Sequence, residues 1–203
     1  MIEIKEIEKN SEQQTEISKS KFFAYSFVVH TEDDVKKHLD NLQKEYPDAT
    51  HICYAYSILG KERAVDDGEP QNTAGKPILD CIKKAGFQNV LVAVVRYFGG
   101  IKLGAGGLLR AYSNCASGVL QISGQKLSVQ CKKVGFEVDI SQSKFTEIMK
   151  KIDLIKKIDI SYGQNILVEF YCLAENLDDI CNQITNILNS KLDFNISRDI
   201  FYV

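Results

Sequence analysis

A glycine-rich stretch holds the residues whose types and spacing point most directly to chemistry. Residues 96–112 read RYFGGIKLGAGGLLRAY and contain five glycines. Glycine accepts positive φ angles and lets a ligand approach backbone amides, and a helix N-terminus there adds unpaired N–H groups that attract an anion. Arginine can grip a phosphate with two hydrogen bonds, and aromatic rings can stack on bases. The stretch predicts a phosphate or nucleic-acid site formed by Arg96, Tyr97, Gly99, Gly100, Lys102, Gly104, Gly106, Gly107, Arg110 and Tyr112.

The same glycines also have a purely structural interpretation. Glycine permits tight turns and close packing of a helix on a sheet, and glycine-rich loops between strands and helices are common. The GxxxxGK[ST] pattern of a P-loop is absent, and the spacing of Gly99, Gly104 and Gly106 differs from that of a dinucleotide-binding fingerprint. The pattern alone therefore leaves both an anion site and a packing role open.

A second stretch, residues 65–77, reads VDDGEPQNTAGKP and is acidic at its start. Its three carboxylates could bind magnesium, act as a general base or form structural salt bridges; they are Asp66, Asp67 and Glu69. Asp-Gly and Glu-Pro are ordinary turn dipeptides, which favours a solvated acidic turn before a capped helix. The end of the stretch adds three residues to the predicted phosphate site: Thr73, Gly75 and Lys76. Thr73 is also the predicted cap of the following helix.

Composition excludes several classes of protein. Lys and Arg number 25 and Asp and Glu number 27, so any nucleic-acid contact must come from a local patch. The longest strongly apolar run, residues 90–95, is too short to cross a bilayer. The N-terminus lacks the apolar region of an export signal, and the six cysteines form no CxxC pair. We expect a soluble cytoplasmic protein with reduced thiols, no membrane contact and no metal site, since His51 and Cys53 lack a second ligand pair.

The apolar pattern predicts an α+β chain of two domains, residues 1–125 and 126–203. For the first domain it predicts strands at 15–29, 51–59 and 90–97, a helix capped by Thr31 and closed by Pro47, a loop over 60–73, a helix that has Pro77 in its first turn and ends at Gly86, and a helix over 108–120. For the second it predicts strands at 127–140, 158–162, 166–173 and 194–203 with helices over 145–155 and 177–188. This βαββαβ order is that of a ferredoxin-like domain.

Four segments taken in order resemble the YigZ/IMPACT family. They are SKSKFFAY (residues 18–25), ATHICYAY (49–56), DDGEPQNTAGKPIL (66–79) and NVLVAVVRYFGGIKLGAGGLLRAY (89–112). The resemblance covers about residues 15–125 and implies the α/β sandwich of domain 2 of small-subunit ribosomal protein five. It also implies that the C-terminal part is similar to domain V of elongation factor G. One departure is Asn72, where the family has glycine; asparagine tolerates the left-handed region that such a turn needs.

The resemblance implies a link to translation or its regulation, with RNA, the ribosome or a translation protein as partner, and supplies no catalytic residues. We therefore expect a non-catalytic binding protein without a cofactor. One alternative is a magnesium-dependent enzyme acting on a phosphorylated small molecule. Another is a protein–protein adaptor in which Arg96 pairs with Asp66 or Glu69 to hold the two stretches together. The oligomeric state is left open by the sequence.

Overall fold

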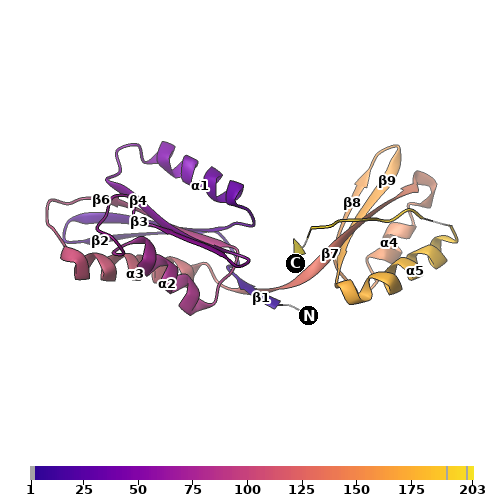
Figure 1. The fold of residues 1–203 in the computed structure, drawn as a ribbon. Helices are drawn as coiled ribbons and strands as arrows, with labels where there is room; N and C mark the ends of the chain where they lie inside the picture. The colour runs from indigo at the N-terminus through magenta and orange to yellow at the C-terminus, as the bar shows by residue number, and fades with distance from the viewer. Residues whose placement is uncertain (1–2, 191, 200) are drawn as a thin grey trace. The chain divides into compact units, whose positions relative to one another are not determined.

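The chain divides into two compact units in a computed structural model that describes residues 3–190, 192–199 and 201–203 (Figure 1). One unit is Lys5–Leu127; the other is Ser128–Val203 with the residues up to Ile4. The expected boundary at residue 125 lies two residues before the observed one. The first residues also differ from expectation, because β1 (Glu3–Glu6) belongs to the same sheet as the first strand of the C-terminal unit.

The N-terminal unit is built on an antiparallel sheet of five strands in the order β2-β3-β6-β4-β5. The strands are β2 (Ser11–Ile17), β3 (Ser20–Val28), β4 (His51–Ile58), β5 (Lys61–Val65) and β6 (Val90–Tyr97). The central strand β6 has the predicted bounds, and its residues are buried up to Arg96. A strand with neighbours on both sides and helices on both faces needs such a continuous apolar run.

Two sequence predictions for this sheet are wrong. The single strand expected over 15–29 is a hairpin of β2 and β3, joined by Ser18 and Lys19 with φ angles of 49° and 65°. A two-residue hairpin turn needs such positive angles, and neither residue belongs to the Asn-Gly type that signals it. The loop expected over 60–73 begins with strand β5, which follows a tight turn at Leu59 and Gly60.

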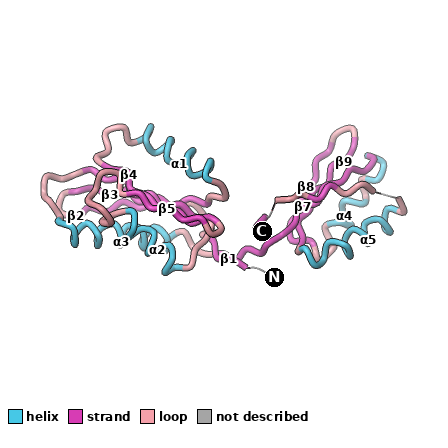
Figure 2. Tube along the Cα trace, in the orientation of Figure 1, coloured by secondary structure: helices cyan, strands magenta, loops and turns pink. Residues whose placement is uncertain are grey.

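Helices cover both faces of this sheet (Figures 1 and 2). Helix α1 (Glu32–Glu45) lies on one face, whereas α2 (Gly75–Ala85) and α3 (Gly104–Ile122) lie on the other. Successive side chains of β6 point to opposite faces of the sheet. Val90, Val92 and Val94 pack in the core beneath α2 and α3, and Leu91, Ala93 and Val95 pack on the side of α1. The predicted caps Thr31 and Gly86 are confirmed. Helix α3 begins four residues before the predicted start, inside the glycine-rich stretch.

The C-terminal unit has the predicted ferredoxin-like arrangement. Its elements are β7 (Lys126–Asp139), a 3₁₀ turn (Ile140–Gln142), α4 (Phe145–Met149), β8 (Ile155–Tyr162), β9 (Asn165–Cys172), a 3₁₀ turn (Ala174–Asn176), α5 (Leu177–Leu188), β10 (Asn195–Ile196) and β11 (Phe201–Tyr202). β7 pairs with β9 on one side and with β10 and β11 on the other, and β8 lies outside β9, all antiparallel. The α+β two-domain prediction is therefore confirmed.

Two elements of this unit are shorter than predicted. The helix expected over 145–155 ends at Met149. Ile152 and Ile155, which continue its apolar pattern, pack on the core from the following loop and from the start of β8. The strand expected over 194–203 consists of the two short pieces β10 and β11. None of the helices in the described ranges combines the length and apolarity needed to cross a membrane.

The capping box of α1 yields a first prediction. Thr31 Oγ1 accepts a hydrogen bond from the Asp34 amide at 3.1 Å, and the Asp34 carboxylate accepts one from the Thr31 amide at 3.0 Å. Thr31→Ala removes one of these bonds and is expected to cost about 1 kcal/mol of helix stability. Hydrogen exchange of the α1 amides measures this loss. Thr31→Ser keeps the hydroxyl and serves as the control; equal exchange in all three proteins would contradict the prediction.

Candidate functional site

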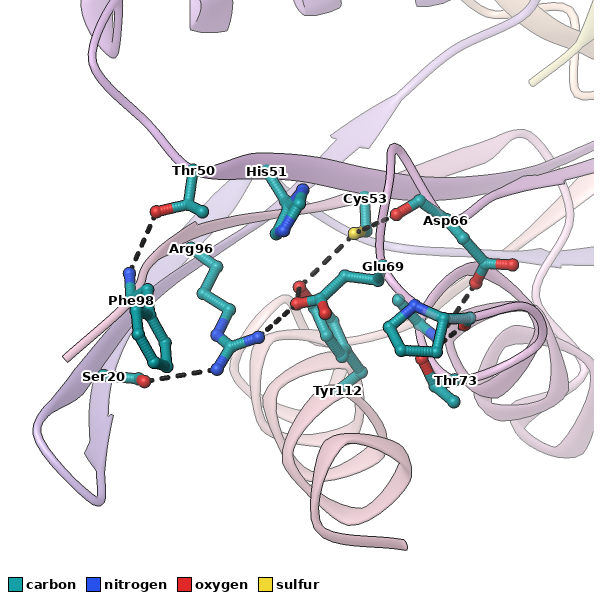
Figure 3. Close-up of polar contacts among 12 residues, drawn as sticks. Ser20, Thr50, His51, Cys53, Asp66, Glu69, Thr73, Arg96, Phe98 and Tyr112 are labelled. Carbon is teal, nitrogen blue, oxygen red and sulfur yellow. Dashed lines mark hydrogen bonds and ion pairs between the residues drawn. The ribbon is translucent and has the colours of Figure 1, made fainter. Parts of the chain in front are cut away.

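The two stretches singled out in the sequence meet through a buried ion pair (Figure 3). Arg96 Nη1 lies 2.5 Å from Glu69 Oε1, and the two side chains are 5% and 4% exposed. Arg96 Nη2 donates a second hydrogen bond to Ser20 Oγ at 3.3 Å, on the neighbouring strand β3. Of the two partners considered for Arg96, the structure has Glu69. The pair fastens the acidic loop to the centre of the sheet.

Tyr112 and Cys53 extend this pair into a network that the sequence did not reveal. The Tyr112 hydroxyl donates to Glu69 Oε1 at 2.8 Å. Cys53 Sγ lies 3.3 Å from Tyr112 Oη and 2.9 Å from the Asp66 carbonyl oxygen, so its one proton can be donated to either. Burial raises the pKa of the Cys53 thiol to about 12 and holds the pKa of Tyr112 far above its usual value. Cys53 is therefore a protonated donor at neutral pH, not an activated nucleophile.

Asp66 and Asp67 hold the loop by accepting backbone hydrogen bonds. The Asp66 carboxylate accepts from the amides of Asn72, Ala74 and Gly75 at 2.8–3.0 Å. Asp67 Oδ2 accepts from the Ile52 amide at 2.6 Å. No group of three or more His, Cys, Asp or Glu side chains placed to hold a metal ion occurs within the described ranges.

The prediction that Thr73 caps α2 is wrong. Thr73 Oγ1 donates to the Pro70 carbonyl at 2.6 Å and makes no capping bond to the helix. Asp66, which lies nine residues before Gly75, caps the helix instead. Its carboxylate accepts hydrogen bonds from the amides of Ala74 and Gly75, which have no partner within the helix. Asn72 has a φ of 60°, so the turn adopts the left-handed conformation that asparagine tolerates.

Two glycines of the predicted site are required by packing. A Cβ at Gly75 would lie 2.5 Å from the Val65 amide nitrogen, and one at Gly99 would lie 2.0 Å from the Lys19 carbonyl carbon. The Gly99 amide is also occupied, since it donates to Ser20 Oγ at 3.2 Å. A Cβ at Gly107 would lie 3.0 Å from Leu103 Cβ, which a small shift of Leu103 could accommodate. For Gly75 and Gly99 the structural interpretation holds.

The part of the stretch around the start of α3 is open to solvent; we call residues 98–107 together with Arg110 the glycine corner. Gly100 and Gly104 have φ angles of 84° and 70°, and an added Cβ would meet nothing within 4 Å at either. Gly104 and Gly106 are exposed at the start of α3, which has neither a side-chain cap nor an acidic residue in its first turn. Lys102 and Arg110 are exposed and line a hollow of about 400 Å³ together with Ser18, Leu103, Gly107 and Asn114.

The structure separates the predicted site residues into two groups. Arg96 and Tyr112 are buried in the network, so neither is free to meet an external phosphate or base, contrary to expectation. Tyr97 is half-buried on the α1 face, against Phe23 and Tyr46. Thr73 and Gly75 are buried, and Lys76 lines a separate groove along α2. Lys102, Arg110 and the exposed glycines remain together at the corner, beside the half-exposed ring of Phe98.

Removing one partner of the buried pair should be costly. Arg96→Met leaves the Glu69 carboxylate buried without its cation, and we expect a loss of roughly 3–5 kcal/mol in the unfolding free energy of the N-terminal unit. Adding Glu69→Gln, which can still accept from Tyr112, should restore part of this loss. Denaturant titration followed through hydrogen exchange of the β6 amides measures both effects. Arg63→Met, on the exposed edge strand β5, is the control; additive losses in the double variant would contradict the coupling.

The raised pKa of Cys53 predicts that the free energy of unfolding falls as the pH rises above 9. The unfolded thiol ionises near its ordinary pKa of 9.0, whereas the folded thiol keeps its proton up to about pH 12. The contribution of Cys53 to stability is therefore complete below pH 9 and is lost as pH rises from 9 towards 12. The stability difference between wild type and Cys53→Ala should be constant from pH 6 to 8 and should narrow by pH 10.5, as measured by urea unfolding. A difference that stays constant to pH 10.5 would refute this.

Proteins with a similar N-terminal domain are known from several organisms. The family model described as the Impact N-terminal domain matches residues 18–120. IMPACT family member YvyE of Bacillus subtilis is 32% identical over 192 residues, which are 92% of this chain and 88% of YvyE. IMPACT family member YigZ of Escherichia coli is 39% identical over 104 residues, which are 48% of this chain and 50% of YigZ.

A solved structure shares the fold along the chain. A crystal structure described as that of a hypothetical protein superposes with a TM-score of 0.70 at 24% identity, covering 98% of this chain and 100% of that one. At 24% identity this similarity shows only that the two proteins share a fold. The family model and a relative matched over 92% of the chain also show the family. This chain is a member of the IMPACT family.

Proposed function

We propose that this protein acts in translation or its regulation as a non-catalytic binding protein that holds RNA phosphate at the glycine corner. The link to translation comes from the resemblance to the YigZ/IMPACT family. The observation that carries the binding role is the open start of α3, with exposed Lys102 and Arg110 around one hollow. No cofactor takes part in this role.

The electrostatics of the corner favour an anion. The first turn of a helix presents unpaired N–H groups, and the macrodipole adds about half a positive charge. In α3 no side chain caps these groups, and no carboxylate in the first turn competes for them. Lys102 and Arg110 add two full charges within the same hollow. A phosphate oxygen placed there would meet backbone donors and cations together.

Phe98 supplies the apolar contact that a nucleic-acid site uses beside phosphate. Its side chain is 46% exposed, unlike those of Tyr97 and Tyr112, and its amide is held by Thr50 Oγ1 at 3.0 Å. The Arg96 guanidinium lies 5.6 Å from the centroid of the Phe98 ring, so the buried network contacts one face of this ring. A base stacked on such a ring contributes about 1–3 kcal/mol. Arg96 therefore acts as a positioning residue for Phe98.

The decisive experiment removes the two exposed cations. Lys102→Ala/Arg110→Ala should weaken binding to ribosomes and to a single-stranded RNA oligonucleotide by at least tenfold at 50 mM salt. The slope of log K against log salt should shrink by about 1.4, because two phosphate contacts are lost. Filter binding for the oligonucleotide and co-sedimentation for ribosomes give these values.

Lys36→Ala/Lys37→Ala on α1 removes the same charge from the opposite face of the sheet and should change little. Phe98→Ala should weaken binding with an unchanged salt slope, since a stacked ring contacts no counterion. Equal affinities for wild type and Lys102→Ala/Arg110→Ala, or no binding by wild type at low salt, would overturn the proposal.

A protein–protein adaptor is the second candidate, and one observation favours it. The ion pair of Arg96 with Glu69 and the capping role of Asp66 place the most distinctive side chains of both stretches inside the fold. If neither RNA nor ribosomes bind, the adaptor role is the one that these contacts support.

A further inference from the structure

A large hollow in the N-terminal unit lies along helices α2 and α3, away from the cations of the glycine corner. It encloses about 1130 Å³ and is lined by residues of both helices together with Lys5, Phe87, Gly124 and Gln125. Figure 1 shows the two helices side by side on the same face of the sheet. The volume exceeds the 300–1,000 Å³ of a typical small-molecule site. We call this hollow the α2–α3 groove.

The floor of the groove combines apolar and short side chains. Leu109 is 47% exposed there and Ala85 is half-buried, whereas the apolar Pro77 and Leu120 beneath them are buried. Between them lie Cys81, Ser113 and Ser117, whose polar atoms bond to one another: Ser117 Oγ to Cys81 Sγ at 3.3 Å, and Cys81 Sγ to the Ser113 carbonyl at 3.5 Å. Short side chains such as these let a further helix approach closely.

The rim of the groove is positively charged. Three lysines and one aspartate line it, Lys5, Lys76, Lys84 and Asp80, which gives a net charge of +2. Lys76 and Lys84 are exposed, and neither takes part in a salt bridge within the described ranges. Lys5 donates to the Ala85 carbonyl at 3.0 Å at the far end. An occupant with carboxylates beside an apolar stripe matches this pattern.

We propose that the α2–α3 groove binds an acidic amphipathic helix of a partner protein. Helix α2 has 11 residues, which at 1.5 Å per residue is about 16 Å, or three turns of a bound helix. Apolar side chains at i, i+3 or i+4, and i+7 of that helix lie against the exposed Leu109 and the short side chains beside it, and its flanking carboxylates face Lys76 and Lys84. The surface is distinct from the one proposed for phosphate, since neither Lys102 nor Arg110 lines it.

The lining argues for a protein partner over a nucleic acid. Phe87 is the one aromatic residue that lines the groove, and it is only 5% exposed, so no ring is available to stack on a base. An apolar floor with a charged rim is instead the usual environment for a helix laid into a groove.

A display library of 18-residue helices tests the proposal on the full chain. Leucine is fixed at i, i+3, i+4 and i+7, and the other positions vary among Glu, Lys and Gln. We expect selection for Glu at the positions that flank the leucines. The selected peptide, labelled and followed by fluorescence anisotropy, should bind Lys76→Glu/Lys84→Glu at least tenfold more weakly than wild type. Ser117→Tyr, which fills the floor without altering charge, should weaken binding similarly.

Two control variants separate this surface from others. Lys36→Glu/Lys37→Glu on α1 and Lys102→Ala/Arg110→Ala at the glycine corner should bind the peptide within twofold of wild type. Circular dichroism confirms that each variant is folded. Selection without acidic enrichment, or unchanged affinity in Lys76→Glu/Lys84→Glu, would overturn the proposal. Displacement of the peptide by a single-stranded RNA from the Lys102→Ala/Arg110→Ala variant would assign the groove to nucleic acid and would overturn it as well.

Discussion

The buried pair of Arg96 and Glu69 is the interaction on which the rest of the N-terminal unit depends. Taking two charges out of water is expensive, and the cost is offset only when each has close partners. Glu69 Oε1 accepts hydrogen bonds from Arg96 and Tyr112, and Arg96 also donates to Ser20. These partners come from the acidic loop and from β6, α3 and β3. The ion pair and its hydrogen bonds thus connect four segments of the chain.

This network explains why the distinctive stretches are needed even where they touch no ligand. Asp66 caps α2 because the loop that carries it is fixed by Glu69, three residues further on. Gly75 and Gly99 let backbone segments approach so closely that a Cβ atom at either position would clash with the neighbouring backbone. The start of α2 is therefore held by buried contacts, whereas the start of α3 is open to solvent. The outer surfaces of these two helices can bind partners without carrying the stability of the fold.

Both units contain surface ion pairs. In the C-terminal unit Lys133 pairs with Glu169 at 2.7 Å and Lys157 with Asp159 at 3.2 Å, and in the N-terminal unit Lys61 pairs with Glu32 and Lys83 with Glu62. In the N-terminal unit, Lys76, Lys84, Lys102 and Arg110 are exposed around hollows without an ion pair among the described residues. Unpaired cations beside a cavity are more available to an anionic partner than cations already neutralised. Both proposed surfaces accordingly lie in the N-terminal unit.

The sequence by itself determined those features that depend on near neighbours. The bounds of β6, the Thr31 and Gly86 caps and the βαββαβ order follow from apolar periodicity and local hydrogen-bonding chemistry, which act within a few residues. Tertiary structure alone decided which charged and aromatic residues are buried. Arg96 and Tyr112 look like ligand-binding residues in the sequence, but their partner Glu69 lies 27 and 43 residues away. Chain topology makes such contacts, and no local pattern encodes them.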